Sequence, residues 1–174
     1  MSTRRTTIHA ASGAVRGLVS DLVGEAGLEV KARAYRTANE LQNQLNNVMR
    51  GERSGRRYKV PGTYARQKDT GELRFRKARN GRYYTASAPG EPPAVRTGAF
   101  RLSWHRRTYA EELAGHEFNV HGVTESDLRV GKHLLGNILE DGTDRMAPRP
   151  YKQRVIDAAM PKIRKIYTEP YFRR

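Results

Sequence analysis

The longest regular apolar pattern of the chain runs over residues 14–49 and predicts a long helix. Apolar side chains recur there every three to four residues, the spacing that places them on one helix face. Gly24 and Gly27 interrupt the pattern, so we expect two helices or one helix broken between these glycines. Gly51 follows Arg50 and predicts a left-handed cap at the helix end. The stripe consists of Val15, Leu18 or Val19, Leu22, Ala26, Ala34, Ala38, Leu41, Leu45 and Val48.

Residues 50–84 carry an unusual share of positive charge. They hold twelve Lys and Arg against three acidic residues, a net charge of +9, in a chain whose total is +15. A strongly basic protein is attracted to polyanions such as nucleic acid, an anionic membrane or an acidic protein. We therefore expect a basic arm over residues 51–96 that contacts a polyanion or a neighbouring subunit. Its candidate contact residues are Arg53, Arg56, Arg57, Lys59, Arg66, Lys68, Arg74, Arg76, Lys77, Arg79 and Arg82.

The arm has two interpretations. Leu73 and Phe75 alternate with arginines, and the Asn-Gly pair at 80–81 favours a tight hairpin turn before two tyrosines, so residues 69–84 predict a β-hairpin. The alternative is a flexible, solvated basic loop, because the segment contains too little apolar surface to fix its conformation.

The next segment predicts a small antiparallel meander. Phe100, Leu102 and Trp104 alternate with polar residues, the period-two pattern of a half-buried strand. Two further strand-like stretches follow, HEFNVHGV and DLRVG.

After Pro150 the helical spacing of apolar residues returns. Pro150 suits the first position of a helix, and Pro161 should kink that helix or split it in two. The expected fold class is α+β in a single domain over residues 1–174. Its parts are an N-terminal helical region (8–50), the basic loop or hairpin arm (51–96), the β-meander (97–133), a corner loop (134–150) and a C-terminal helix (151–168).

The sequence contains little that indicates catalysis or metal binding. Cysteine is absent, which excludes disulfides and thiolate zinc sites, and His116 and His121 would lie on opposite faces of a strand. Glu140 and Asp141 with His133 are a possible acid–base set, but neighbouring side chains in extended chain diverge. No phosphate-binding glycine motif is present. We therefore expect no enzymatic activity, no metal and no cofactor.

The apolar runs are short. No stretch of about 18 apolar residues exists, so we expect no membrane span. The first residues are broken by glycine and serine and do not resemble a secretory signal.

Two segments resemble landmarks of a phage protein family. APGEPPAVRTGAFRLSW (88–104) is similar to a Thr-Gly-x-apolar-x-x-Ser motif that precedes a first strand, and LLGNILEDGTDRMAPRPYKQRVIDA (134–158) is similar to a Glu-x-Gly-Thr, loop, Arg-Pro motif before a last helix. The family is that of the neck and tail-completion proteins, also called head–tail joining or minor tail proteins, of long-tailed double-stranded DNA phages. The matching residues are Thr97, Gly98, Ser103, Glu140, Gly142, Thr143, Arg149 and Pro150. An aromatic residue usual before the second motif is replaced here by Leu134-Leu135-Gly136.

The resemblance implies a structural virion protein that forms a homo-oligomeric ring, with six-fold symmetry, at the head–tail junction. Its partners would be the neighbouring neck rings on the head-closure or adaptor side and on the tail-terminator or tail-tube side. Non-specific contact with genomic double-stranded DNA is also implied, as is assembly in the host cytoplasm. The alternative is a free-standing basic nucleic-acid-binding protein, which the composition favours although no helix-turn-helix, RNP or KH motif is present.

The residues of the second motif predict a rigid corner. Gly142 permits a sharp turn, and Thr143 can hydrogen-bond to a neighbouring backbone group. Arg149 is close enough in sequence to pair with Glu140, within one subunit or between two. The alternative is a corner that serves only the fold of the monomer.

Overall fold

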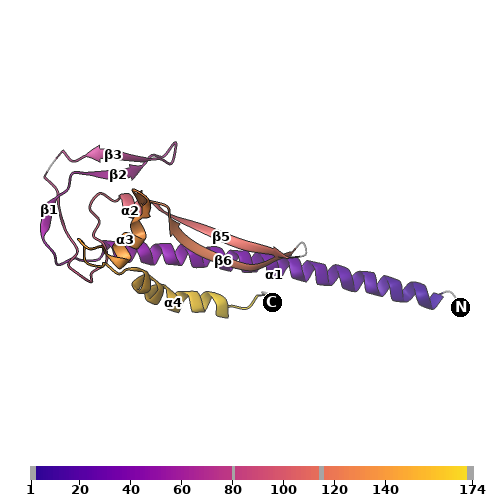
Figure 1. The fold of residues 1–174 in the computed structure, drawn as a ribbon. Helices are drawn as coiled ribbons and strands as arrows, with labels where there is room; N and C mark the ends of the chain where they lie inside the picture. The colour runs from indigo at the N-terminus through magenta and orange to yellow at the C-terminus, as the bar shows by residue number, and fades with distance from the viewer. Residues whose placement is uncertain (1–2, 80, 114–115, 172–174) are drawn as a thin grey trace.

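A single helix, α1 (Thr3–Arg50), runs along most of the molecule, and the other elements are arranged along and beyond its C-terminal part (Figure 1). The computed structural model describes the backbone of residues 3–79, 81–113 and 116–171, and the side chains of residues 22–79, 81–110 and 120–171. The fold is α+β, as expected, with a long N-terminal helix, small antiparallel sheets and a C-terminal helix.

The expected break in the first helix is wrong. α1 is one helix of 48 residues, and it passes through Gly24 and Gly27 without interruption. A glycine costs a helix only about 1 kcal/mol, and the regular hydrogen bonding on both sides carries the helix through. The left-handed cap at Gly51 is also wrong, because Gly51 is not among the glycines with positive φ. Arg53 instead donates to the free carbonyls of Val48 and Met49.

The hydrophobic core lies where the C-terminal part of α1 meets α2 (Ala99–Leu102), α3 (Leu135–Asp141) and α4 (Lys152–Thr168). Its buried members are Leu45, Met49, Tyr151 and Val155, with Leu41, Val48, Val95, Phe100, Trp104 and Leu139 packed around them. The rings of Phe100, Trp104 and Tyr151 meet edge to face with centroids 5.6–5.9 Å apart. Each such ring pair contributes about 0.5–1.5 kcal/mol beyond its buried area.

A long hairpin, β5 (Trp104–Leu113) and β6 (His116–Ser126), lies along α1. The close approach requires Gly122, because a Cβ there would overlap the carbonyl group of Ala34. Ala34 and Ala38 are fully buried beneath the hairpin, and the Thr124 hydroxyl donates to the Ala38 carbonyl at 3.1 Å. Small side chains on both surfaces thus let strand and helix backbones touch.

The predicted meander is only partly correct. Phe100 and Leu102 belong to α2 rather than to a strand, which begins at Trp104. HEFNVHGV does form a strand, as part of β6. The DLRVG segment forms β7 (Arg129–Val130), but β7 pairs with β8 (His133–Leu134) and not with the long hairpin.

The arm contains four short strands, but not the predicted hairpin. β2 (Gly62–Arg66) pairs with β3 (Leu73–Lys77), whereas β1 (Arg57–Lys59) pairs with β4 (Tyr83–Thr85). Tyr83 and Tyr84 therefore do not pair with the strand that contains Leu73 and Phe75. Asn80 of the predicted turn lies outside the described residues.

α4 packs against α1 through Val155, Ala159 and Ile166, which are buried. Pro161 lies inside this continuous helix and does not split it. Pro150 is not the first helical residue, because Tyr151 is the N-cap and the helix begins at Lys152. Among the described residues, no helix is long and apolar enough to cross a membrane.

Candidate functional site

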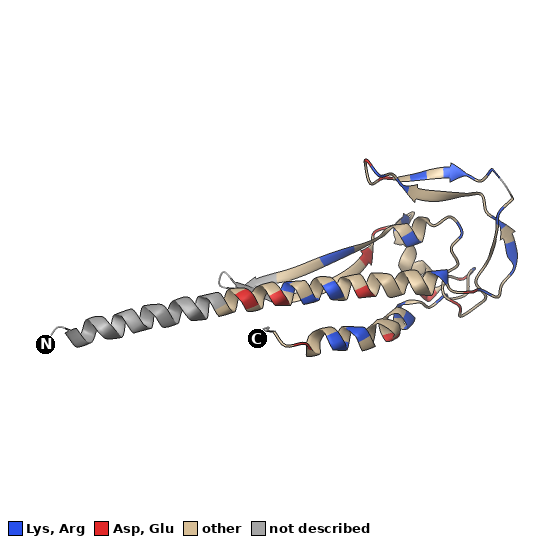
Figure 2. Ribbon diagram, turned by 180° about the vertical axis from the view of Figure 1, so that it is seen from behind, with Lys and Arg blue, Asp and Glu red and all other residues tan. Residues whose placement is uncertain are grey.

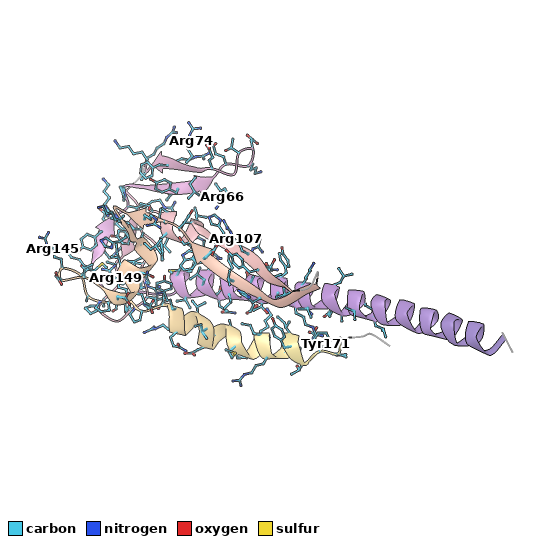
Figure 3. All side chains as sticks on the ribbon, turned by 45° about the vertical axis from the view of Figure 1, so that its right-hand side comes forward. Arg66, Arg74, Arg107, Arg145, Arg149 and Tyr171 are labelled. Carbon is cyan, nitrogen blue, oxygen red and sulfur yellow. The ribbon has the colours of Figure 1, made fainter. Side chains whose placement is uncertain are left out.

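The basic residues of the arm form an exposed surface (Figure 2). All of the arm residues selected from the sequence are exposed except Arg53. Arg74 and Arg76 lie opposite Ala65 and Thr63 on one face of the β2–β3 hairpin. Figure 3 shows Arg74 on the side of this hairpin that is turned away from the helices. Seven of these side chains make no hydrogen bond or ion pair with the described part of the chain: Lys59, Lys68, Arg74, Arg76, Lys77, Arg79 and Arg82.

Two arm arginines hydrogen-bond to backbone carbonyls of the body. The Arg53 guanidinium donates to the carbonyls of Val48 and Gly51, each at 2.7 Å, and thereby closes the end of α1. Arg66 donates to Leu102 O at 2.8 Å, which ties β2 to α2. These two residues are structural anchors of the arm.

Aromatic rings alternate with the basic residues of the arm. Tyr64 and Phe75 pair across β2 and β3 with ring centroids 5.2 Å apart, and Phe75 is 44 % exposed. Arg57 lies over the ring of Tyr83, which is 58 % exposed. Arg56 similarly lies over Tyr58. The arm therefore presents cations and large apolar surfaces side by side.

The second motif forms a corner between α3 and α4. The Glu140 carboxylate accepts hydrogen bonds from the backbone N–H groups of Tyr151 (3.0 Å) and Lys152 (3.2 Å), the first amides of α4. The predicted pair with Arg149 does not form within one subunit: among the described residues, the Arg149 side chain has no hydrogen-bond or ion-pair partner. A pair between two subunits stays a prediction. Arg149 takes part through its backbone, whose N–H donates to Leu139 O at 2.8 Å.

The turn of the corner has the geometry that the sequence predicts. Gly142 has φ 79° and ψ −169°, a conformation that is nearly restricted to glycine. A Cβ there would lie 2.7 Å from Met146 O and 2.8 Å from Pro148 N. The Thr143 hydroxyl accepts the backbone N–H of Arg145 at 3.3 Å, as expected. Asp144 and Arg145, at the tip, are exposed.

The first motif builds the entry to α2. Gly98 has φ 82° and is the N-cap of α2, and Thr97 Oγ1 lies 3.5 Å from the Ala99 amide. Ser103 is buried and hydrogen-bonds to Phe100 O at 2.8 Å and to Ser126 Oγ at 2.6 Å. The motif thus joins α2 to the long hairpin.

The two motifs meet in space through Phe100 and Tyr151. Gly136 packs closely against Tyr151, because a Cβ at Gly136 would lie 2.8 Å from the Tyr151 hydroxyl. That hydroxyl donates to Gly136 O at 3.3 Å. Burial, with the nearby carboxylates of Glu140 and Asp141, raises the pKa of Tyr151 well above its ordinary value, so the hydroxyl remains a donor.

α1 extends beyond the other elements on its N-terminal side (Figure 1). Leu22, Val23 and Leu28 are 51 %, 52 % and 70 % exposed, and no atom apart from the adjacent helix backbone lies within 4 Å of the Cβ positions of Gly24 and Gly27. The three exposed apolar side chains point to different sides of the helix, since a helix turns by about 100° per residue.

Sequence reasoning missed two groups of residues. Glu91 binds the Ser54 amide and hydroxyl, 37 positions away, and no local pattern reveals such a pair. Arg50, Arg53 and Arg101 line one cavity. Arg101 belongs to α2, and the sequence pattern had predicted a strand there, so this grouping was not foreseen.

The chain matches no protein-family model, and no curated protein or solved structure is significantly similar to it.

Proposed function

We propose that this protein is a structural component of a phage virion, which assembles as a homo-oligomeric ring at the head–tail junction and joins head to tail around the DNA channel. The observation that carries the proposal is the projecting part of α1, where Leu22, Val23 and Leu28 are at least half exposed. A monomer gains nothing from these exposed apolar side chains, whereas neighbouring subunits packed around this helix segment would remove them from water. Burying one such side chain fully contributes about 1.5–3 kcal/mol.

The ring explains why the uncovered surfaces lie far apart. A closed ring requires two different surfaces on each subunit, one of which binds the other on the next subunit. α1 projects from one side of the body, whereas the arm and the corner lie at its other end (Figure 1). The two resemblances to neck proteins, at 88–104 and 134–158, support the same role.

Native mass spectrometry of the purified protein tests the ring. We expect a defined oligomer of six subunits at micromolar concentration. Leu28→Lys should dissociate this oligomer, because the contact would bury a lysine ammonium whose removal from water is unfavourable. Ala158→Lys is the matched control, since Ala158 is an exposed position of α4, outside the projecting segment, and the substitution adds the same charge. A wild-type protein that remains monomeric at tens of micromolar would contradict the proposal.

Within the ring, we assign the arm to contact with a neighbouring protein ring. Aromatic residues and arginine are enriched in protein interfaces, and Phe75 and Tyr83 lie exposed among the arm's cations. Replacing Arg74, Arg76, Lys77 and Arg79 by glutamate should then leave heads and tails unjoined in a complementation assay. The control replaces the exposed Lys132, Arg145, Arg164 and Lys165 by glutamate, which changes the net charge equally. Joined particles that fail to retain or eject DNA would favour a DNA-channel role for the arm.

A free-standing nucleic-acid-binding protein is the second candidate function. The observation in its favour is the set of exposed arm cations without partners among the described residues. Such a protein would bind short DNA duplexes regardless of sequence, and the affinity would fall with salt by about one log–log unit per phosphate contact. Tight, salt-sensitive DNA binding by a monomer would favour this function over the ring.

A further inference from the structure

Three arginines surround a cavity of about 360 Å³ at the base of the arm. Arg50 is the last residue of α1, Arg53 follows it, and Arg101 belongs to α2. Tyr84 of β4 and Val95 also line this cavity. The cavity therefore lies where the end of the long helix, the arm and the first family motif come together.

Two of these arginines hold buried donors that lack an acceptor. The Nε atoms of Arg53 and Arg101 are buried, and neither has a hydrogen-bond partner in the described structure. The Nη atoms of Arg53 do donate hydrogen bonds to backbone carbonyls. The Arg101 side chain forms no hydrogen bond or ion pair with any described residue. A charged donor that is removed from water without an acceptor is unfavourable. Arg101 also lines the cavity, so its guanidinium has donors there that no described residue uses.

The charge in the cavity is also unbalanced. Burial lowers the pKa of Arg101, and the neighbouring charge of Arg50 lowers it further. Burial likewise lowers the pKa of Arg53, which Glu91 partly offsets. A guanidinium still remains protonated in a protein, so the positive charges persist and need a counter-charge. Glu52 lines the cavity, but it is exposed and pairs with none of these arginines.

We propose that this cavity binds one oxyanion group, a phosphate or a carboxylate, which accepts hydrogen bonds from Arg101 and receives charge from Arg50 and Arg53. A guanidinium presents parallel N–H donors that match both groups in a bidentate arrangement. The cavity has the size of a small-molecule site, which suits a small ligand or an acidic side chain.

Occupancy would have a structural effect. The bound group would connect α1, α2 and the loop through Val95, next to β4 of the arm. It would therefore fix the base of the arm relative to the body. The site does not depend on the ring proposed above, because all three arginines belong to one chain.

Isothermal titration calorimetry at constant ionic strength tests the site with inorganic phosphate, with glutarate and with a short DNA duplex. We expect saturable binding of phosphate or glutarate with one site per chain, and the tighter of the two identifies the source of the oxyanion. Arg101→Gln should weaken this binding at least tenfold. Arg164→Gln, which removes an exposed arginine of α4, should leave it unchanged. No saturable binding of either small anion, equal affinity in Arg101→Gln, or binding of the duplex alone would overturn the proposal.

Thermal unfolding provides a second readout and checks that the variants fold. In chloride alone, Arg101→Gln should unfold at a temperature at least as high as the wild type, because it removes an unpaired, half-buried charge. Phosphate should then raise the midpoint of the wild type more than that of the variant. Arg50→Gln, whose side chain is exposed, should retain the fold and lose part of the phosphate effect. Equal phosphate stabilisation of all three proteins would contradict the site.

Discussion

Glu140 and Tyr151 are joined across the corner by a hydrogen bond of 3.0 Å from the Tyr151 amide to the Glu140 carboxylate. The same carboxylate oxygen accepts the Lys152 amide at 3.2 Å. α4 has no side-chain cap from its own N-cap residue, so a residue of α3 satisfies its first amides. A negative charge at this end of α4 also interacts favourably with the helix dipole. The corner therefore couples the positions of the two helices.

Replacing Glu140 by alanine should lower the free energy of unfolding by about 1 kcal/mol, the usual effect of losing an N-cap acceptor. Urea unfolding followed by circular dichroism measures it. Asp141→Ala is the matched control, because Asp141 is an exposed neighbour that makes no hydrogen bond within the described residues. Equal effects of both substitutions would show that Glu140 acts by charge alone.

Replacing Gly142 by alanine should destabilise the protein more than the loss of the cap. The backbone conformation alone costs a residue other than glycine about 1–3 kcal/mol. The added Cβ would also lie 2.7 Å from Met146 O, which is too close without a shift of the turn. Thr143→Ala, which removes one weak hydrogen bond in the same turn, should have a much smaller effect in the same assay. A Gly142→Ala protein with wild-type stability would contradict the strained corner.

Arg33 should tie the C-terminal segment to α1. Its fully buried guanidinium donates to Glu169 O (2.7 Å) and Pro170 O (3.0 Å) and lies 3.8 Å from the centroid of the Tyr171 ring, the residue labelled at the end of α4 in Figure 3. Arg33→Met should cost about 2–4 kcal/mol, because the carbonyls of Glu169 and Pro170 and the carboxylate of Glu29 lose one buried charged donor together. Hydrogen exchange should then increase over residues 163–171.

Arg36 supplies the matched control for Arg33. Its ion pair with Glu169 at 2.7 Å joins side chains that are 38 % and 41 % exposed. Exposed pairs of this kind contribute at most about 1 kcal/mol, so Arg36→Met should change the unfolding free energy little. If Arg36→Met is as damaging as Arg33→Met, burial is not what makes Arg33 important.

Glu91 should make the loop at the base of the arm sensitive to acid. The hydrogen bond from the Ser54 hydroxyl, together with the Ala88 and Ser54 amides, lowers the pKa of Glu91 from 4.5 to about 2. Because the folded state binds this proton more weakly, the stabilising contribution is present above pH 4.5 and is lost as the pH falls through about 2.

The difference in stability between wild type and Glu91→Gln isolates this contribution. It should be constant above pH 5 and shrink toward zero as the pH approaches 2. Urea midpoints for the two proteins over this range measure it. A difference that does not vary with pH would mean that Glu91 acts only through its shape.

Local patterns predicted those parts of the fold that depend on nearby residues. The helical spacing over residues 14–49 and after Pro150 identified both long helices, because a face of apolar residues specifies a helix before any partner is known. The requirement for glycine at position 142 could also be predicted from the sequence, since a sharp turn depends on the backbone of its own residues.

The sequence did not predict which strands pair. β3 has the alternation expected of a strand, but its partner is β2 and not the segment that follows it. Alternation describes one strand and not the choice between two possible partners, which depends on how the arm docks through Arg66 onto α2. The alternation at Phe100 and Leu102 was misleading for a related reason, because the short helix α2 also packs Phe100 against the core.

The sequence by itself thus determined the α+β class, the two long helices, the basic arm and the glycine of the corner, because these depend on composition and local geometry. Only the tertiary structure decided that Glu140 caps α4 instead of pairing with Arg149. It also decided that Arg50, Arg53 and Arg101 face one cavity. Those relationships join residues that are distant in the chain, and packing in three dimensions is what brings such residues within hydrogen-bonding reach.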